Sequence, residues 1–71
     1  MKEFATYEDY DKTVFHLVEI NEEQTEICVV KVHQGKIATT TYQLFKNKNG
    51  LYFEYGRCFT KIYVNEFEEV E

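Results

Sequence analysis

The sequence predicts an all-β domain, and two observations support this fold class. Hydrophobic residues make up 44% of the 71-residue chain and aromatic residues 17%, which is enough apolar material for a core. Proline is absent, and each of the three glycines separates two stretches rich in β-branched or aromatic residues, as the turns of β-hairpins do. We therefore expect one small domain of short antiparallel strands, with no room for a second domain.

Four breaks divide the middle of the chain into five predicted strands. They are the segment 21–24 and the turns that contain Gly35, Gly50 and Gly56. Asn49 with Gly50 is the strongest turn signal, because both residue types tolerate the positive φ of a tight type I′ turn. The predicted strands are residues 13–20, 25–33, 36–46, 51–55 and 57–64. Because short turns join neighbouring antiparallel strands, the simplest arrangement is a five-stranded antiparallel meander.

The N-terminal segment has a different pattern. Residues 6–9 have the spacing of a helix capping box, and aromatic side chains recur every third residue at Phe4, Tyr7 and Tyr10. A helix this short needs a surface to pack against. We therefore expect a short helical turn in residues 4–12 that lies on the sheet.

The predicted organisation is a single domain, 1–71. It consists of the N-terminal segment (1–12), the β-meander (13–64) and an acidic tail (65–71) that lies past the last strand.

Alternation of side chains along the strands sorts the meander into two faces. The predicted core face holds Val14, His16, Val18, Ile20, Ile27, Val29, Ala38, Thr40, Tyr42, Leu44, Leu51, Phe53, Tyr55, Cys58, Thr60, Ile62 and Val64. The outer face, which carries Phe15, is mixed. A flat sheet cannot bury its core face, so we expect the strands to curl into a small, partly open barrel, SH3-like or OB-like. The alternative is an open sheet covered by the N-terminal segment or by a second subunit.

The cysteines and histidines do not form a predicted metal site. Cys28 and Cys58 fall on opposite faces and no CxxC motif is present, so we expect two free thiols. In the inferred register His16 lies opposite Val29, four residues before His33, which separates the imidazoles by roughly 13 Å. Zinc needs its ligands at one point. We therefore expect no metal ion and no cofactor.

Catalytic motifs are also missing from the sequence. It contains no GxSxG, no HExxH, no P-loop and no glycine-rich dinucleotide turn. The threonine run 39–41 is ordinary for a strand. The glutamate pairs 22–23 and 68–69 fall in a predicted turn and tail, and exposed carboxylates are poor acid–base catalysts at neutral pH. We expect the protein not to be an enzyme.

Aromatic residues of the outer face form the first candidate contact surface, and they are Phe45, Tyr52, Phe59 and Tyr63. An exposed aromatic patch often marks a contact surface. Three interpretations compete: cross-strand packing that stabilises the sheet, self-association or partner binding, and base stacking on single-stranded nucleic acid. The last ranks third, because the only nearby cations are Lys46, Arg57 and Lys61.

Acidic residues form the second candidate contact surface. Thirteen Asp and Glu against eight Lys and Arg give the chain a formal charge of −5. In the meander the tail returns to the end that holds the 21–24 turn, which predicts an acidic end made of Glu22, Glu23, Glu26, Glu66, Glu68 and Glu69. Solvated charge is the simpler interpretation. The sharper hypothesis is an anionic surface that docks into a basic groove of another protein, where nucleic acid otherwise lies.

The sequence also bears on location and on nucleic acid. No uncharged apolar run approaches the ~20 residues that a bilayer needs, and the start, MKEFATYEDYDK, is too acidic for a secretory signal. We therefore expect a cytoplasmic protein without a membrane contact. The acidic balance argues against direct binding of duplex nucleic acid, which depends on Lys and Arg.

By size and composition the chain resembles the short acidic accessory proteins of phages and mobile elements, many of which act as stoichiometric inhibitors. The leading hypothesis is a non-enzymatic protein-interaction module that mimics nucleic acid and occupies the basic groove of a host protein. The alternative is a structural or assembly protein that forms a homodimer through the aromatic face. An OB-like single-strand binder is the third hypothesis.

Overall fold

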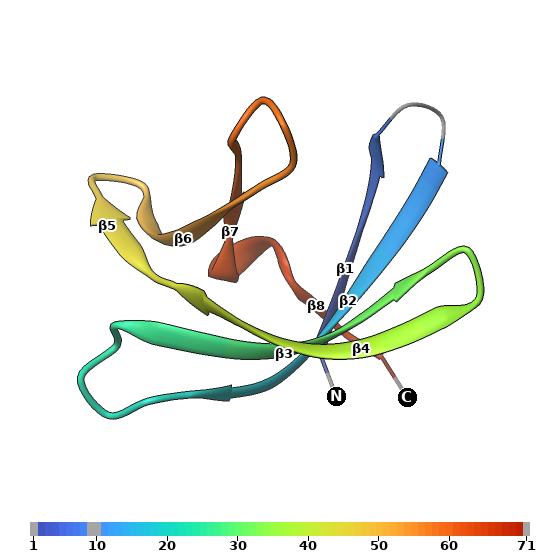
Figure 1. The fold of residues 1–71 in the computed structure, drawn as a ribbon. Coiled ribbons are helices and arrows are strands. Elements are labelled where there is room, and N and C mark those ends of the chain that lie inside the picture. Colours follow the sequence, from blue (N-terminus) through green and yellow to red (C-terminus); the bar gives the residue numbers. More distant parts are fainter. Residues whose placement is uncertain (1, 9–10, 71) are drawn as a thin grey trace.

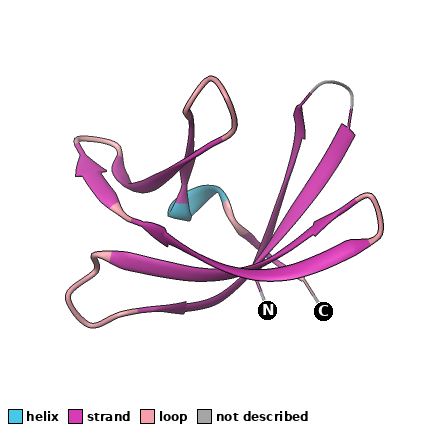
Figure 2. Ribbon diagram, in the orientation of Figure 1, coloured by secondary structure: helices cyan, strands magenta, loops and turns pink. Residues whose placement is uncertain are grey.

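The computed structural model describes residues 2–8 and 11–70 of the chain. Its elements are β1 (Lys2–Glu8), β2 (Asp11–Ile20), β3 (Glu26–His33), β4 (Lys36–Gln43), β5 (Phe45–Asn47), β6 (Gly50–Tyr55), β7 (Thr60–Tyr63), the 3₁₀ turn η1 (Val64–Glu66) and β8 (Glu68–Glu69). Strands dominate the fold (Figure 2), so the predicted all-β class is confirmed.

Two antiparallel sheets share one core. The larger has the strand order β4-β3-β2-β1-β8, and the smaller has the order β5-β6-β7. The smaller sheet lies over the concave side of the larger one (Figure 1), and the two do not join into a closed barrel. The arrangement is compatible with the predicted small, partly open barrel.

The N-terminal segment is a strand, and the helical turn predicted for residues 4–12 is wrong where the structure describes it. β1 pairs with β2 so that Phe4 lies opposite Phe15 and Thr6 opposite Thr13. Phe4 packs on Phe67 with a ring-centroid distance of 5.7 Å. A two-residue alternation therefore fits this segment better than the three-residue spacing of aromatics, whose last member, Tyr10, lies outside the described residues.

The predicted strand 36–46 divides at Leu44, where the chain passes from the larger sheet to the smaller one. Leu44 is 5% exposed, and its backbone N–H donates to the Thr25 carbonyl (2.8 Å). One buried leucine thus anchors the crossing between sheets. The five predicted strands consequently do not form a single meander.

The turn predicted at Gly35 is present, but the type I′ conformation forms there and not at the predicted Asn49–Gly50 site. Gln34 and Gly35 carry the paired positive φ values, 50° and 74°, between the facing residues His33 and Lys36. Such a pair is typical of a type I′ turn. At the predicted type I′ site Gly50 alone has a positive φ, 119°, and it already belongs to β6.

The last predicted strand, 57–64, starts three residues late. A turn closed by the Phe59 N–H to the Gly56 carbonyl (3.2 Å) occupies its beginning. Cys58 therefore lies exposed in this turn, and its predicted place on the core face is wrong.

A β-bulge at Val18 explains why the predicted face of β2 is inverted. Leu17 lies opposite Val29 but Glu19 lies opposite Cys28, so Val18 is an extra residue in β2. His16 consequently lies opposite Val30 instead of Val29. A slip of one residue turns a side chain to the other face, and Val18 is 57% exposed.

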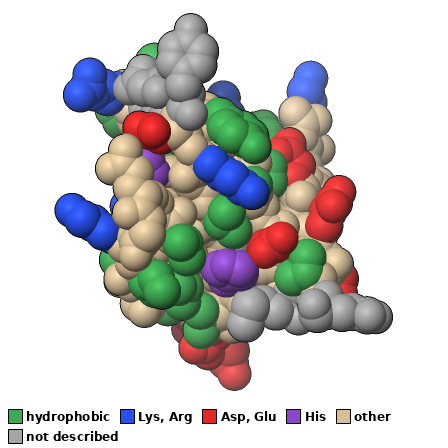
Figure 3. Space-filling view, turned by 90° about the vertical axis from the view of Figure 1, so that its right-hand side faces the viewer, with side chains coloured by type: hydrophobic (Ala, Val, Ile, Leu, Met, Phe, Trp, Pro, Cys, Tyr) green, Lys and Arg blue, Asp and Glu red, His purple; other side chains and the backbone are tan. Residues whose placement is uncertain are grey.

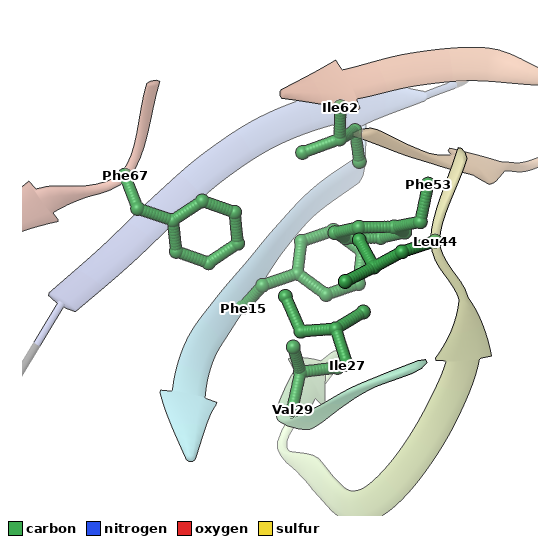
Figure 4. Close-up of a cluster of buried hydrophobic side chains, with 7 residues drawn as sticks. All are labelled: Phe15, Ile27, Val29, Leu44, Phe53, Ile62 and Phe67. Atoms are coloured by element: carbon green, nitrogen blue, oxygen red, sulfur yellow. The ribbon is translucent and has the colours of Figure 1, made fainter. Parts of the chain in front are cut away.

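The core shows the result of this inversion (Figure 4). Its buried residues are Phe15, Ile27, Val29, Leu44, Phe53, Ile62 and Phe67. Phe15, predicted for the outer face, is fully buried and makes edge contacts with Phe53 (5.6 Å) and Tyr55 (5.0 Å). The other buried residues apart from Phe67 were all predicted for the core face, namely Ile27, Val29, Leu44, Phe53 and Ile62.

The C-terminal segment belongs to the fold. Phe67 is 6% exposed and contributes to the core, and β8 pairs with β1 through Lys2–Glu69 and Glu3–Glu68. The predicted acidic tail is therefore held in place along the β1 edge of the larger sheet.

Candidate functional site

A concave groove with an acidic lining lies on the outside of the fold, between β1 and the C-terminal segment. We call it the acidic groove; its lining residues are Glu3, Phe4, Ala5, Glu66, Glu68 and Val70, and its volume is about 300 Å³. Strand pairing positions the carboxylates, because Glu3 lies directly opposite Glu68. Directly opposed like charges destabilise a strand pair, so this pairing sets two acidic residues against each other at the groove.

His16 lies beside the acidic groove, opposite Glu3 in the β1–β2 pair. Its Nδ1 lies 3.5 Å from the Glu3 Oε2. This nitrogen is buried and has no hydrogen-bond partner among the described residues. Figure 3 shows one face of the molecule, on which hydrophobic, acidic and histidine side chains lie near one another.

The predicted acidic end is divided between two places. Glu66 and Glu68 line the acidic groove, and Glu69 lies beside them in β8, opposite Lys2. Glu22 and Glu23 lie in the β2–β3 turn, at the far left of Figure 1.

Glu26 begins β3, where it lines a shallower hollow of about 170 Å³. Glu68 is three strands across the sheet and four residues along it from Glu26, a separation on the order of 20 Å. The meander predicted one acidic end because it placed the tail past the last predicted strand, at the end that holds the 21–24 turn, whereas the tail pairs with β1.

Glu3 is the carboxylate of the groove that the sequence analysis did not predict. It lies in the segment predicted to be helical, and only its pairing with both β2 and β8 brings it to Glu68. The two-residue alternation of residues 2–8 was the available signal.

Three of the four predicted aromatic residues form one row on the outer face of the smaller sheet. We call Phe45, Tyr52 and Tyr63 the aromatic row. Tyr52 lies opposite both others, with ring-centroid distances of 5.7 Å to Phe45 and 5.3 Å to Tyr63. Phe59, in contrast, lies in the β6–β7 turn with 69% exposure and a φ of 51°.

Polar contacts hold the aromatic row in place. The Lys61 Nζ lies over the Tyr52 ring at 5.6 Å, a cation–π geometry. The Asn47 amide donates to the Tyr63 hydroxyl (2.9 Å), and this hydrogen bond lowers the pKa of Tyr63. The row is thus an ordered surface whose central ring has a cation over one face.

The charge around the aromatic row is opposite to that of the chain as a whole. Residues 44–63 contain four cations, Lys46, Lys48, Arg57 and Lys61, and a single carboxylate, Glu54. Glu54 lies opposite Lys61 in the β6–β7 pair. The smaller sheet is therefore locally basic in a protein with a charge of −5.

The histidines and cysteines lie in separate places. His33 Nδ1 lies 2.8 Å from the buried Thr13 hydroxyl on the inner side of the larger sheet, whereas His16 is on the outer side. Cys28 is half-buried and Cys58 is exposed, and both are free thiols. Across residues 2–8 and 11–70, no group of three His, Cys, Asp or Glu side chains is arranged to hold a metal ion.

Comparison with known proteins found no matching family model, no similar curated protein and no similar solved structure. In the part of the chain that the structure describes, no helix has the length and apolar character needed to cross a bilayer.

Proposed function

We propose that the chain is a non-enzymatic protein-interaction module whose acidic groove binds a lysine or arginine side chain on the basic surface of a partner. The observation that supports this proposal is the convergence of Glu3, Glu66 and Glu68 around an apolar lining that includes Phe4 and Val70. Lys and Arg have an aliphatic stem and a cationic head. Both parts of such a side chain find a complementary surface in the groove.

The energetics favour a cationic ligand. Glu3 and Glu68 repel each other in the free protein, because they lie opposite one another in the β1–β8 pair. A cation between them replaces this repulsion with attraction. Since the carboxylates are near the surface, the interaction should weaken as salt shortens the screening length to about 8 Å.

The finer proposal concerns the identity of the partner. The groove would receive one basic side chain, and the chain as a whole has a net charge of −5. Both features are complementary to the basic surface of a nucleic-acid-binding protein. In this proposal the carboxylates stand in place of phosphates, and the module inhibits its partner by excluding nucleic acid. Duplex DNA should then compete with the module for the partner.

A charge-reversal experiment tests the groove. The probe is a decaarginine peptide titrated by NMR at low and at physiological salt. Glu66→Lys with Glu68→Lys should weaken binding by about tenfold or more, equivalent to about 1.4 kcal/mol. The control, Glu22→Lys with Glu23→Lys, makes the same charge change in the β2–β3 turn and should have a much smaller effect. Equal losses in both variants would mean that only net charge matters, and the groove would not be the site.

The aromatic row supports a second candidate function, the binding of single-stranded nucleic acid. The specific observation in its favour is the Lys61 ammonium over the Tyr52 ring of the row, in a segment, 44–63, that carries four cations and one carboxylate, since aromatic stacking with local positive charge is how such strands are held. The test is titration with an oligothymidine. Phe45→Ala should abolish binding, and Tyr7→Ala, which removes an exposed ring from β1, should not.

Homodimer formation through the aromatic row is the alternative use of this surface. A parent protein that is dimeric and a Phe45→Ala variant that is monomeric would identify it.

A further inference from the structure

The two edges of the larger sheet differ in length and in protection. β8, at one edge, has two residues. β4, at the other edge, has eight residues, and it pairs with β3 without a register shift from Glu26–Gln43 to His33–Lys36. The backbone groups of β4 that point away from β3 therefore form a long, regular row at the end of the sheet.

Natural edge strands are usually protected by proline, by a bulge, by a charge in mid-strand or by being short. β4 (KIATTTYQ) has no proline, no bulge and a single charged residue, Lys36, at its first position. Six of its eight residues are exposed. This edge is open to another strand along its length.

We propose that β4 pairs in antiparallel orientation with β4 of a second copy of this chain, so that two larger sheets become one continuous sheet. Charge argues for a second copy as the occupant. β4 contains none of the thirteen acidic residues of the chain, so two copies with a charge of −5 can approach at this edge without opposed carboxylates.

The side chains of β4 are also compatible with self-pairing. Matching the faces of the two sheets requires a twofold axis at a residue and not between two residues, because partners in an antiparallel pair share a face. Axes at Thr39 and at Thr40 are the ones that pair the greatest length of β4. An axis at Thr40 sets Thr39 opposite Thr41 of the second copy, a favourable threonine pair. In either register the Lys36 side chains of the two copies are about 20 Å or more apart. The single charged residue of β4 therefore causes no repulsion between the paired strands.

The opposite edge of the larger sheet is interrupted, which limits the size of the assembly. β8 covers β1 only at Lys2 and Glu3, so this edge passes from β8 to β1 and offers β4 no continuous strand of matching length for a head-to-tail chain. A β4–β4 contact uses the same surface on both copies and closes at a dimer. The acidic groove lies at the β1–β8 edge, away from β4, so the dimer would carry two free grooves and bind a repeated basic surface with avidity.

Sedimentation velocity over a range from about 10 μM to about 1 mM, spanning the affinities of weak dimers, tests this proposal. The parent protein should form a dimer within the range. Thr39→Lys with Thr41→Lys should give a monomer, because lysines then oppose lysines in either register. The control, Val18→Lys with Phe59→Lys, adds the same charge at exposed positions of β2 and of the β6–β7 turn and should still dimerise.

A charge-swap experiment separates strand pairing from a general loss of fold. Thr39→Glu with Thr41→Glu should be monomeric alone, and mixing it with the lysine variant should restore a heterodimer.

Disulfide formation in a Cys58→Ala background identifies the register. Thr40→Cys should cross-link two copies if the axis is at Thr40, and Thr39→Cys should do so if the axis is at Thr39, since paired Cα atoms lie within disulfide reach. A parent protein that stays monomeric at about 1 mM, or a dimer that survives the lysine variant, would overturn the proposal. Loss of the dimer in Phe45→Ala but not in the lysine variant would place the contact on the aromatic row instead.

Discussion

Glu3 and Glu68 lie directly opposite one another in the short β1–β8 pair, so that the strand contact which completes the sheet also brings two carboxylates together. This contact is electrostatically unfavourable in the free protein. The same two residues line the acidic groove, so changing either one should alter both the stability of the protein and the proposed binding of a cation.

Removing one of these charges should stabilise the free protein. In Glu68→Gln the repulsion from Glu3 is absent, and the free energy of unfolding should rise by on the order of 0.5 kcal/mol at low salt. Urea denaturation measures the difference, which should shrink as salt is added. Glu22→Gln, in the β2–β3 turn, is the matched control and should leave stability nearly unchanged. A Glu68→Gln variant less stable than the parent would show that the pair is not repulsive.

The inverted face of β2 can be checked in the core. Phe15 is fully buried against Phe53 and Tyr55, so Phe15→Ala should cost about 3–5 kcal/mol and unfold much of so small a domain. Val18, at the bulge, is 57% exposed, and Val18→Ala should cost far less. Thermal denaturation followed by circular dichroism compares the two. The reverse ranking would mean that β2 presents its other face to the core.

Stability should fall at alkaline pH because of Tyr42. Burial raises the pKa of this phenol above its ordinary value of 10.0, against the opposing effect of Lys31. Above about pH 10 the unfolded chain therefore loses a proton that the folded protein retains, and the free energy of unfolding decreases with pH. In Tyr42→Phe, urea denaturation between about pH 9 and pH 11 should show a smaller decrease. An identical pH dependence in parent and variant would contradict the assignment.

The two thiols should differ in accessibility. Cys58 is exposed in the β6–β7 turn and Cys28 is half-buried, so a thiol reagent should modify Cys58 quickly and Cys28 slowly in the folded protein. After denaturation without reductant both should react at once. Cys58→Ala should remove only the fast phase. A protein with no reactive thiol after denaturation would contain a disulfide that this fold does not form.

Local chemistry made several elements predictable. Strands β3 and β6 begin and end within one residue of the predicted limits 25–33 and 51–55, because Asn, Gly and Gln clusters mark their turns. Ile27, Val29, Leu44, Phe53 and Ile62 were placed in the core from alternation alone, and each is buried.

Long-range pairing accounts for what the sequence did not reveal. The bulge at Val18 has no glycine or proline to mark it, yet it decides which side of β2 carries Phe15. Leu44 belongs to an uninterrupted β-rich stretch, and only the position of the smaller sheet shows that the strand ends there. In the candidate site, Glu66 and Glu68 were predicted from charge, whereas Glu3 required knowledge of a pairing across most of the chain.

That pairing also sets the order in which the protein can be completed during synthesis. Glu3 and Glu68 are about 65 positions apart in the sequence, whereas β1 to β4 are joined by successive hairpins. On the ribosome, where chains emerge at about 5–20 residues per second, these hairpins can form before β8 exists. The loop that β8 closes is the longest in the domain and has the largest entropic cost. A nascent chain can therefore form the acidic groove only after β8 has emerged and paired with β1.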